Sequence, residues 1–361
     1  MSELKDLEAL VVQVRRDILR MVHEVNSGHP GGSLGCTEFF VAMYNQVMEL
    51  KDTFDMDGIG EDLFFLSNGH ISPVYYSVLA RKGFFPLEEL NTFRKINSRL
   101  QGHPATHEGL PGIRIASGSL GQGMSVAIGA ALAKKLNGDS HLIYSLHGDG
   151  ELQEGQVWEA VMFAAGRNVD NLIATIDRNG QQIDGPTEEV MPLGDVKAKF
   201  EAFGWDVVSL KEGNDLQAII QTMEEAKKRT GKGKPVAVIM ETVMGHGVDF
   251  MMHTHAWHGK APNDEQLEQA LHDFDFLKNA LQTMQQVQQS VADREEQERE
   301  ALGQRPLVIR TLDIGGDKLL AYSDATAEAN PELGLRAMRF LFRHHDIFHQ
   351  QLHLLYIAYI H

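Results

Sequence analysis

An acidic residue between two glycines, together with an asparagine further along the chain, is the feature best suited to hold a cation. Asp149 lies in Gly148-Asp149-Gly150, and Asn179 follows Gly150 by 179 − 150 = 29 positions. A carboxylate oxygen, an amide oxygen and a main-chain carbonyl near Gln181 are hard ligands of the kind that Mg²⁺ or Ca²⁺ prefers, with water and phosphate completing the shell. The same residues also fit an ordinary turn in which Asp149 caps the following helix.

These residues can meet only if the elements before them run side by side. Apolar runs at 142–146 and 172–176 predict strands that end just before Asp149 and Asn179, with a helix at 156–166 between them. The carboxyl ends of such parallel strands lie at one edge of a sheet. The sequence therefore predicts an α/β fold with a parallel sheet flanked by helices. Further strands are expected at 63–66, 206–209 and 236–241, and further helices at 7–25, 36–47, 121–136, 196–203 and 216–229.

The overall charge limits the partners. The chain has 33 Lys+Arg against 50 Asp+Glu, and this net charge of −17 repels a nucleic acid backbone or an anionic membrane surface. The sequence contains no apolar run of membrane-spanning length, and its acidic N-terminus lacks the features of a signal peptide. We therefore expect a cytoplasmic protein that binds neither nucleic acid nor membrane. Cys36 is the one cysteine, which excludes an internal disulfide.

Residues 4 to about 272 resemble the thiamine-diphosphate-binding half of transketolase, in the style of the short N-terminal subunit of split bacterial transketolases. The family's motifs occur here in order, which makes a chance match improbable. Besides the Gly-Asp-Gly to Asn179 pair, the matching stretches are Asn26-Ser27-Gly28-His29-Pro30-Gly31, Leu66-Ser67-Asn68-Gly69-His70, Gly102-His103-Pro104, Gly118-Ser119-Leu120-Gly121-Gln122-Gly123, Ile183-Asp184-Gly185 and Ala256-Trp257-His258-Gly259-Lys260.

This resemblance implies a bound metal and a bound phosphate group. Asp149, Asn179 and the carbonyl of Gln181 are expected to hold Mg²⁺, which would bridge the diphosphate of thiamine diphosphate. Gly150 is expected to lie close to one of the phosphates, because a glycine lets a ligand approach the backbone.

The resemblance also implies the remaining contacts to the cofactor. His70 and His258 are expected to donate hydrogen bonds to the diphosphate or to neighbouring atoms. The backbones of Gly118 and Leu120 are expected to meet the aminopyrimidine, with Ser119 binding the cofactor between them.

Two further histidines, His29 and His103, are expected to be catalytic and to face the substrate. They would polarise its carbonyl or hydroxyl groups and move protons during carbon–carbon cleavage, a role suited to a pKa of about 6.5. Glu154 matches the acidic position after the family's Gly-Asp-Gly. We expect it among the cofactor-binding residues, at the contact between the two halves of the site.

The resemblance further implies a partner chain. In transketolases a glutamate that protonates the aminopyrimidine lies in a pyrimidine-binding domain, and nothing after residue 275 resembles that domain. We therefore expect this chain to form half of a transketolase active site, completed by a pyrimidine-binding subunit in a dimer or heterotetramer. The implied reaction moves a two-carbon ketol unit between ketose and aldose phosphates, as in the pentose phosphate pathway.

The end of the chain resembles a different family. Residues 288 to 352 or so, with Arg310 and Arg336, are similar to part of the phosphoenolpyruvate-binding barrel of enzyme I of the bacterial sugar phosphotransferase system. A complete barrel needs about 200 residues or more, whereas only 361 − 275 = 86 follow position 275. We therefore expect a transketolase-like domain at 1–275, a Gln/Glu-rich linker helix at 276–304 and an incomplete, inert β/α-barrel fragment at 305–361.

Two other functions remain open at this stage. The α-type subunit of a two-chain 2-oxo-acid dehydrogenase also carries a Gly-Asp-Gly to Asn motif, although His29-Pro30 and Trp257-His258-Gly259 argue against it. The other alternative is a non-catalytic cofactor-binding module fused to an inactive phosphotransferase fragment.

Overall fold

The computed structural model describes residues 2–274. The chain divides into two units, Met1–Met284 and Gln285–His361, and every described residue belongs to the first unit. The predicted linker at 276–304 and the predicted barrel fragment at 305–361 lie outside the described residues. The boundary placed at residue 275 stays a prediction.

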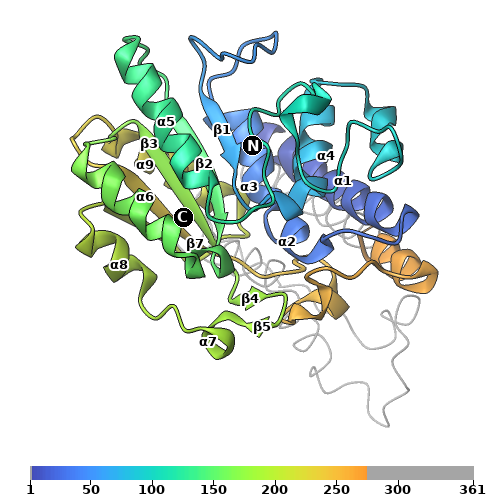
Figure 1. Ribbon diagram of the computed structural model, residues 1–361. Helices are drawn as coiled ribbons and strands as arrows, with labels where there is room; N and C mark the ends of the chain where they lie inside the picture. The colour runs from blue at the N-terminus through green and yellow to red at the C-terminus, as the bar shows by residue number, and fades with distance from the viewer. Residues whose placement is uncertain (1, 275–361) are drawn as a thin grey trace, which may run out of the picture. The chain divides into compact units, whose positions relative to one another are not determined.

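A five-stranded parallel sheet forms the centre of the described residues (Figure 1). The strands lie in the order β1-β2-β3-β7-β6, and every neighbouring pair is parallel, which confirms the predicted α/β fold. A short antiparallel pair, β4 with β5, lies outside this sheet. The strands are β1 Leu63–Leu66, β2 Ile143–Gly148, β3 Leu172–Arg178, β4 Gln181–Gln182, β5 Gly185–Pro186, β6 Asp206–Leu210 and β7 Val236–Glu241.

Helices cover both faces of the sheet because its strands are apolar on both sides. Successive side chains of a strand point to opposite faces. Phe64 and Leu66 accordingly join a core with α1, α3, α4 and α9, whereas Leu63 and Phe65 join a second core with α5, α6 and α8. The helices are α1 Ser2–Glu24, α2 Pro30–Gly35, α3 Thr37–Ala42, α4 Ser72–Lys82, α5 Gly123–Leu136, α6 Gly155–Gly166, α7 Thr187–Val190, α8 Val196–Ala202 and α9 Leu216–Arg229.

The structure adds helices to those predicted near the N-terminus. Helix α2 begins at Pro30, between the helices predicted at 7–25 and 36–47. Proline suits the first helical position because its φ angle is already helical and its missing N–H is not needed there. The helix expected at 36–47 is α3 followed by a π-helical turn at Met43–Val47, and α4 was not expected at all.

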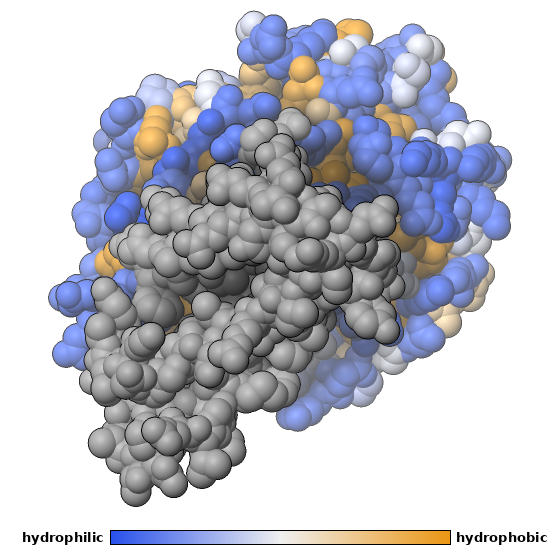
Figure 2. Space-filling model, turned by 180° about the vertical axis from the view of Figure 1, so that it is seen from behind, coloured by the Kyte–Doolittle hydropathy of each residue, from blue (hydrophilic) through white to orange (hydrophobic). Residues whose placement is uncertain are grey.

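Much of the surface of the described residues is hydrophilic. On the face shown in Figure 2, hydrophilic residues predominate and hydrophobic ones form scattered patches. Within residues 2–274, no helix is long and apolar enough to cross a membrane.

Candidate active site

The loops that follow β2 and β3 bring Asp149 and the segment of Asn179 together, as the sequence predicts. The two strands pair in parallel with Gly148 opposite Asp177, and the Asp149 N–H donates to the Asp177 carbonyl at 3.1 Å. The Asp149 carboxylate accepts hydrogen bonds from the N–H of Gly150 at 2.8 Å and from the N–H of Gly180 at 2.7 Å. Asp149 therefore caps the short turn at Gly150–Gln153, and it also ties the two loops to each other.

The electrostatics around Asp149 favour a bound cation. Its side chain is almost fully buried, and burial together with the charge of the neighbouring Asp177 raises the pKa of Asp149 to about 7. Burial also raises the pKa of Asp177. Two buried carboxylates repel each other when ionised, and a divalent ion would remove that cost. Among residues 2–274 no group of three or more His, Cys, Asp and Glu could hold a metal, and the ligand roles of Asn179 and the Gln181 carbonyl stay predictions.

Four histidines from distant parts of the chain meet at the same end of the sheet. The ring centroid of His29 lies 5.1 Å from that of His70, 6.2 Å from that of His103 and 5.7 Å from that of His258. The rings of His70 and His258 stack at 5.0 Å. We call these four residues the histidine cluster. Sequence reasoning selected these four among the 17 histidines of the chain.

Burial sets the protonation of the histidine cluster. It is the main cause that lowers the pKa of His29 to about 4, with smaller contributions from His258, Arg94 and His103. Burial likewise lowers the pKa values of His70, His103 and His258. The pKa values of His29 and His103 therefore lie below the ordinary histidine value. Neutral imidazoles can both donate and accept a hydrogen bond at pH 7.

The histidine cluster adjoins two loops that contain glycine, one at Gly118 and one at Gly259. Gly118 has a φ angle of +123°, and a Cβ atom there would lie 2.8 Å from the ring of His103. A Cβ on Gly259 would lie 3.4 Å from Ile183 and 3.5 Å from His29. The loop after Asn179 thus reaches the histidine cluster, and Figure 1 shows α2 and the β4–β5 pair at this end of the sheet.

Glu151 joins three segments of the site, and sequence reasoning missed it. Its buried carboxylate accepts from the Ser67 hydroxyl, from the Gly121 N–H at 2.7 Å and from the Gly148 N–H at 3.2 Å. Burial raises the pKa of Glu151, but His147 and these donors outweigh it and hold the pKa below its usual value. The only sequence signal was an acidic residue directly after Gly-Asp-Gly.

The other predicted cofactor residues lie in loops or at helix ends. Ser119 accepts a hydrogen bond from Gln122 at 3.0 Å, and the carbonyl of Leu120 accepts one from Gln156 at 3.1 Å. Glu154 is exposed at the start of α6, and its side chain does not cap that helix. The hydrogen bond from Gln156 holds the loop at Ser119 and Leu120 beside the start of α6.

Several buried polar atoms around the site lack a hydrogen-bond partner. Buried polar groups in folded proteins normally have one, so these atoms mark places where a polar ligand fits. The polar ligand would supply partners that residues 2–274 do not. The atoms are His29 Nδ1, Asn68 Oδ1, Ser117 Oγ, Gln181 Oε1 and His258 Nδ1.

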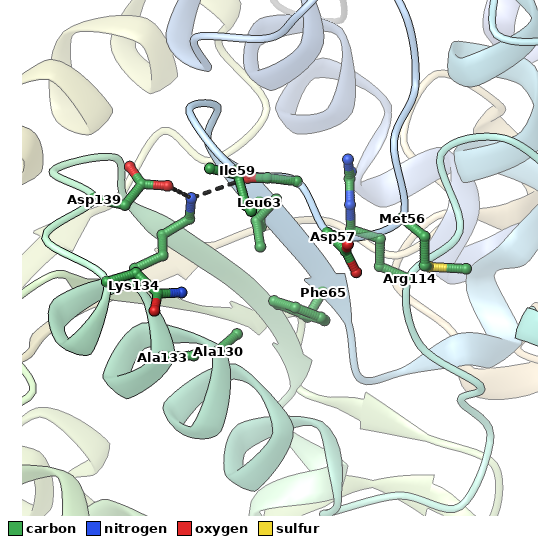
Figure 3. A pocket seen from close by; sticks show the side chains of 12 residues that line it. Met56, Asp57, Ile59, Leu63, Phe65, Arg114, Ala130, Ala133, Lys134 and Asp139 are labelled. Atoms are coloured by element: carbon green, nitrogen blue, oxygen red, sulfur yellow. Dashed lines mark hydrogen bonds and ion pairs between the residues drawn. The ribbon is translucent and has the colours of Figure 1, made fainter.

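A separate hollow of about 270 Å³ lies beside β1 and α5 and contains none of the predicted site residues (Figure 3). Three of its charged side chains, Lys134, Asp139 and Arg114, are in ion pairs. Lys134 contacts Asp139 at 2.6 Å, and Arg114 contacts Glu61 at 2.6 Å. These ion pairs hold the wall of the hollow together.

Comparison with known proteins supplies the family. The model of "Transketolase, thiamine diphosphate binding domain" matches residues 7–306. The chain is 40% identical over 251 residues to the 6-deoxy-6-sulfo-D-fructose transketolase subunit SqwG of Clostridium sp., which covers 69% of this chain and 90% of that protein. It is 37% identical over 269 residues to an apulose-4-phosphate transketolase subunit of Actinobacillus succinogenes, covering 74% of this chain and 95% of that protein.

Solved structures agree with the sequence match. The transketolase of Leishmania mexicana has a TM-score of 0.69 and 29% sequence identity, over 74% of this chain and 41% of that one. The chain therefore spans less than half of this full-length transketolase. A second model, "PEP-utilising enzyme, PEP-binding domain", matches residues 272–361 and overlaps the first match at 272–306. With its parallel sheet, its histidine cluster and a family match over most of its length, the chain belongs to the transketolase family, as a relative of the short N-terminal subunits.

Proposed function

We propose that this chain is the thiamine-diphosphate-binding subunit of a two-chain, Mg²⁺-dependent transketolase. The observation that carries the proposal is the convergence of the histidine cluster and of Asp149 with the segment of Asn179 at one end of the sheet. Thiamine diphosphate, when bound, supplies the carbon nucleophile for cleavage of a carbon–carbon bond in a ketose. The reaction transfers the resulting two-carbon ketol unit from a ketose phosphate to an aldose phosphate.

The chain's own oxygens would anchor the cofactor. Asp149, Asn179 and the carbonyl of Gln181 would hold Mg²⁺ against the diphosphate, and Gly150 would leave room for a phosphate beside the backbone. A cation is needed here because the chain carries a formal net charge of −17 and the local carboxylates are buried. The unpartnered Gln181 Oε1 also supports a polar ligand at this loop.

Two members of the histidine cluster would contact the cofactor, and the other two would contact the substrate. His70 and His258 would donate hydrogen bonds to the diphosphate side, while Gly118, Ser119 and Leu120 would meet the aminopyrimidine. The neutral imidazoles of His29 and His103 would face the substrate. Each could orient a hydroxyl or carbonyl group and carry a proton between substrate oxygens.

The partner would pack on the outer face of α5 and α6, the two helices that begin at the site. Their exposed apolar side chains include Val126 at 41% and Leu136 at 88% exposure on α5, and Met162 at 59% and Phe163 at 46% on α6. The two helices lie side by side (Figure 1). An apolar strip on neighbouring helices is typical of a protein interface. A partner on this strip would also reach Glu154 and the loop before α5, and two such pairs would form a heterotetramer.

The test is two-carbon transfer from xylulose 5-phosphate to ribose 5-phosphate by the full chain, with and without a candidate pyrimidine-domain subunit. Transfer is expected only with both chains, Mg²⁺ and thiamine diphosphate. Because relatives are named for a sulfonated ketose and for apulose 4-phosphate, 6-deoxy-6-sulfo-D-fructose and apulose 4-phosphate serve as alternative donors. Absence of transfer with every donor, despite a stable complex of the two chains, would contradict the proposed function.

A pair of variants tests the proposed interface. Met162→Glu is expected to abolish binding of the pyrimidine-domain subunit while cofactor binding persists. Ile96→Glu is the matched control, because Ile96 is 93% exposed and lies outside α5 and α6. Equal partner affinity in both variants would place the interface elsewhere.

A further inference from the structure

Asp177 is a buried carboxylate beside Asn179, and it is not among the residues proposed to bind the metal, the cofactor or the substrate. It is the penultimate residue of β3 and is 2% exposed. It accepts hydrogen bonds from the Thr242 hydroxyl, from the Asn179 side-chain Nδ2 at 2.8 Å and from the Cys36 thiol. Burying a carboxylate is costly unless donors surround it, and here three side chains provide them.

The hydrogen bond to Asn179 decides which end of its amide points where. An asparagine side chain has a donor end and an acceptor end of nearly the same shape. The Nδ2 end donates to the Asp177 carboxylate, so Asp177 holds the nitrogen end. The Oδ1 end then points the other way, where it accepts the Gln181 N–H at 2.9 Å. A flipped amide would set oxygen against carboxylate on one side and N–H against N–H on the other.

We propose that Asp177 is a positioning residue that fixes the Asn179 amide so that its oxygen, and not its nitrogen, is presented to the cation. This inference rests on the proposed function, since it concerns the ligand shell of the proposed Mg²⁺ site. Oδ1 has a second lone pair beyond the one that accepts from Gln181, and that lone pair is the one a hard cation takes. Thr242, directly after β7, and Cys36, before α3, also donate to Asp177 and offset the cost of burying its carboxylate.

Two substitutions separate the hydrogen bond from the charge. Asp177→Asn and Asp177→Ala both remove one negative charge, but only the asparagine can still offer an oxygen to Asn179. Mg²⁺ is titrated calorimetrically into the full chain in the presence of a fixed excess of thiamine diphosphate. Asp177→Ala is expected to weaken Mg²⁺ binding about tenfold or more relative to Asp177→Asn, the range found when a residue that orients a metal ligand is lost. Equal losses in the two variants would overturn the positioning role.

Thr242→Val is the matched control. It removes another donor to Asp177 with little change of shape, and it leaves the bond between residues 177 and 179 in place. It is expected to lower the stability of the chain while keeping Mg²⁺ affinity within about twofold of wild type. A tenfold loss of Mg²⁺ affinity in Thr242→Val would show that the affinity depends on packing around Asp177 in general and not on the orientation of the Asn179 amide. That result would overturn the inference.

A measurement on the wild-type chain covers the case in which Asp177→Ala does not fold. In ¹⁵N-asparagine-labelled protein without metal, the Asn179 side-chain amide is assigned as the signal missing from Asn179→Asp. Its protons are expected to exchange with solvent at least about tenfold more slowly than those of Asn137, an exposed residue at the end of α5. Equal exchange rates would overturn the inference. A different result would contradict the proposed function itself: a wild-type chain that binds neither Mg²⁺ nor thiamine diphosphate.

Discussion

Acidification is expected to destabilise the cofactor-free chain through the histidine cluster. These imidazoles are buried, and burial lowers their pKa values, so the folded chain resists protonation that the unfolded chain accepts. A histidine with a lowered folded-state pKa contributes full stability above its unfolded pKa. That stability is lost as the pH falls from the unfolded toward the folded pKa, because the unfolded state then binds more protons.

The size of the effect can be worked out for His29. Its pKa is 6.5 as the ordinary value and about 4 in the folded chain. Between pH 7.5 and pH 5.5 this difference removes about 1.3 kcal/mol from the free energy of unfolding. The other three histidines change the stability in the same direction. The raised pKa of Asp149 acts in the opposite direction, so the His29 contribution is read as a difference between a His29 variant and wild type. The contribution of His29 to the free energy of unfolding should keep falling down to a pH of about 4.

Urea unfolding followed by tryptophan fluorescence measures this loss. The chain's three tryptophans, at positions 158, 205 and 257, all lie within residues 2–274, so the signal reports on this part. His29→Asn is the test variant, because asparagine is favoured before a helix start such as α2. Between pH 7.5 and pH 5.5 the free energy of unfolding of this variant should change by about 1 kcal/mol less unfavourably than that of wild type. His107→Asn, at a side chain that is 79% exposed, is the control and should behave as wild type. An unchanged pH dependence in His29→Asn would refute the reasoning.

Three further predictions concern turnover, the loops and the core. His29→Ala and His103→Ala should leave cofactor binding nearly intact and reduce turnover with the partner about 10²-fold or more; a large loss of cofactor affinity, seen by calorimetry, would instead place them against the cofactor. Glu151→Ala should weaken thiamine diphosphate binding about tenfold or more, because three site segments lose their common acceptor; the exposed Glu159→Ala on α6 is its control, and equal affinities would contradict the role. Glu38→Ala should cost about 3–5 kcal/mol in urea unfolding, since it leaves the buried Arg15 guanidinium without its carboxylate; a loss under about 1 kcal/mol would show that Arg15 finds water or another partner.

Much of the fold was predictable because parallel strands carry an unmistakable pattern. The runs at 142–146 and 172–176 are apolar at nearly every position, as expected of strands buried on both faces, and they appear as β2 and β3. The meeting of Asp149 with the loop of Asn179 followed from that topology alone. The structure extends both strands by two residues at their carboxyl ends, because main-chain pairing continues through polar residues such as Asp177 that hydropathy does not mark.

The parts that were missed depend on tertiary contacts. Helix α4 was not expected because Ser72–Lys82 is buried over most of its length and lacks an amphipathic pattern. The roles of Glu151 and Asp177 were invisible because their partners come from distant segments, such as Ser67 for Glu151 and Thr242 for Asp177. The histidine cluster could be selected only through the family resemblance, since nothing in the spacing of its members predicts that they meet.

Calorimetric titration of thiamine diphosphate into the full chain, with and without Mg²⁺, is the most direct measurement of the proposed cofactor site. Wild type is expected to bind the cofactor only when Mg²⁺ is present. Asp149→Ala is expected to abolish that binding, because it removes one of the few hard ligands for the ion that neutralises the diphosphate beside buried carboxylates. Unchanged affinity in Asp149→Ala, or equal binding with and without Mg²⁺, would contradict the assignment of this end of the sheet as the cofactor site.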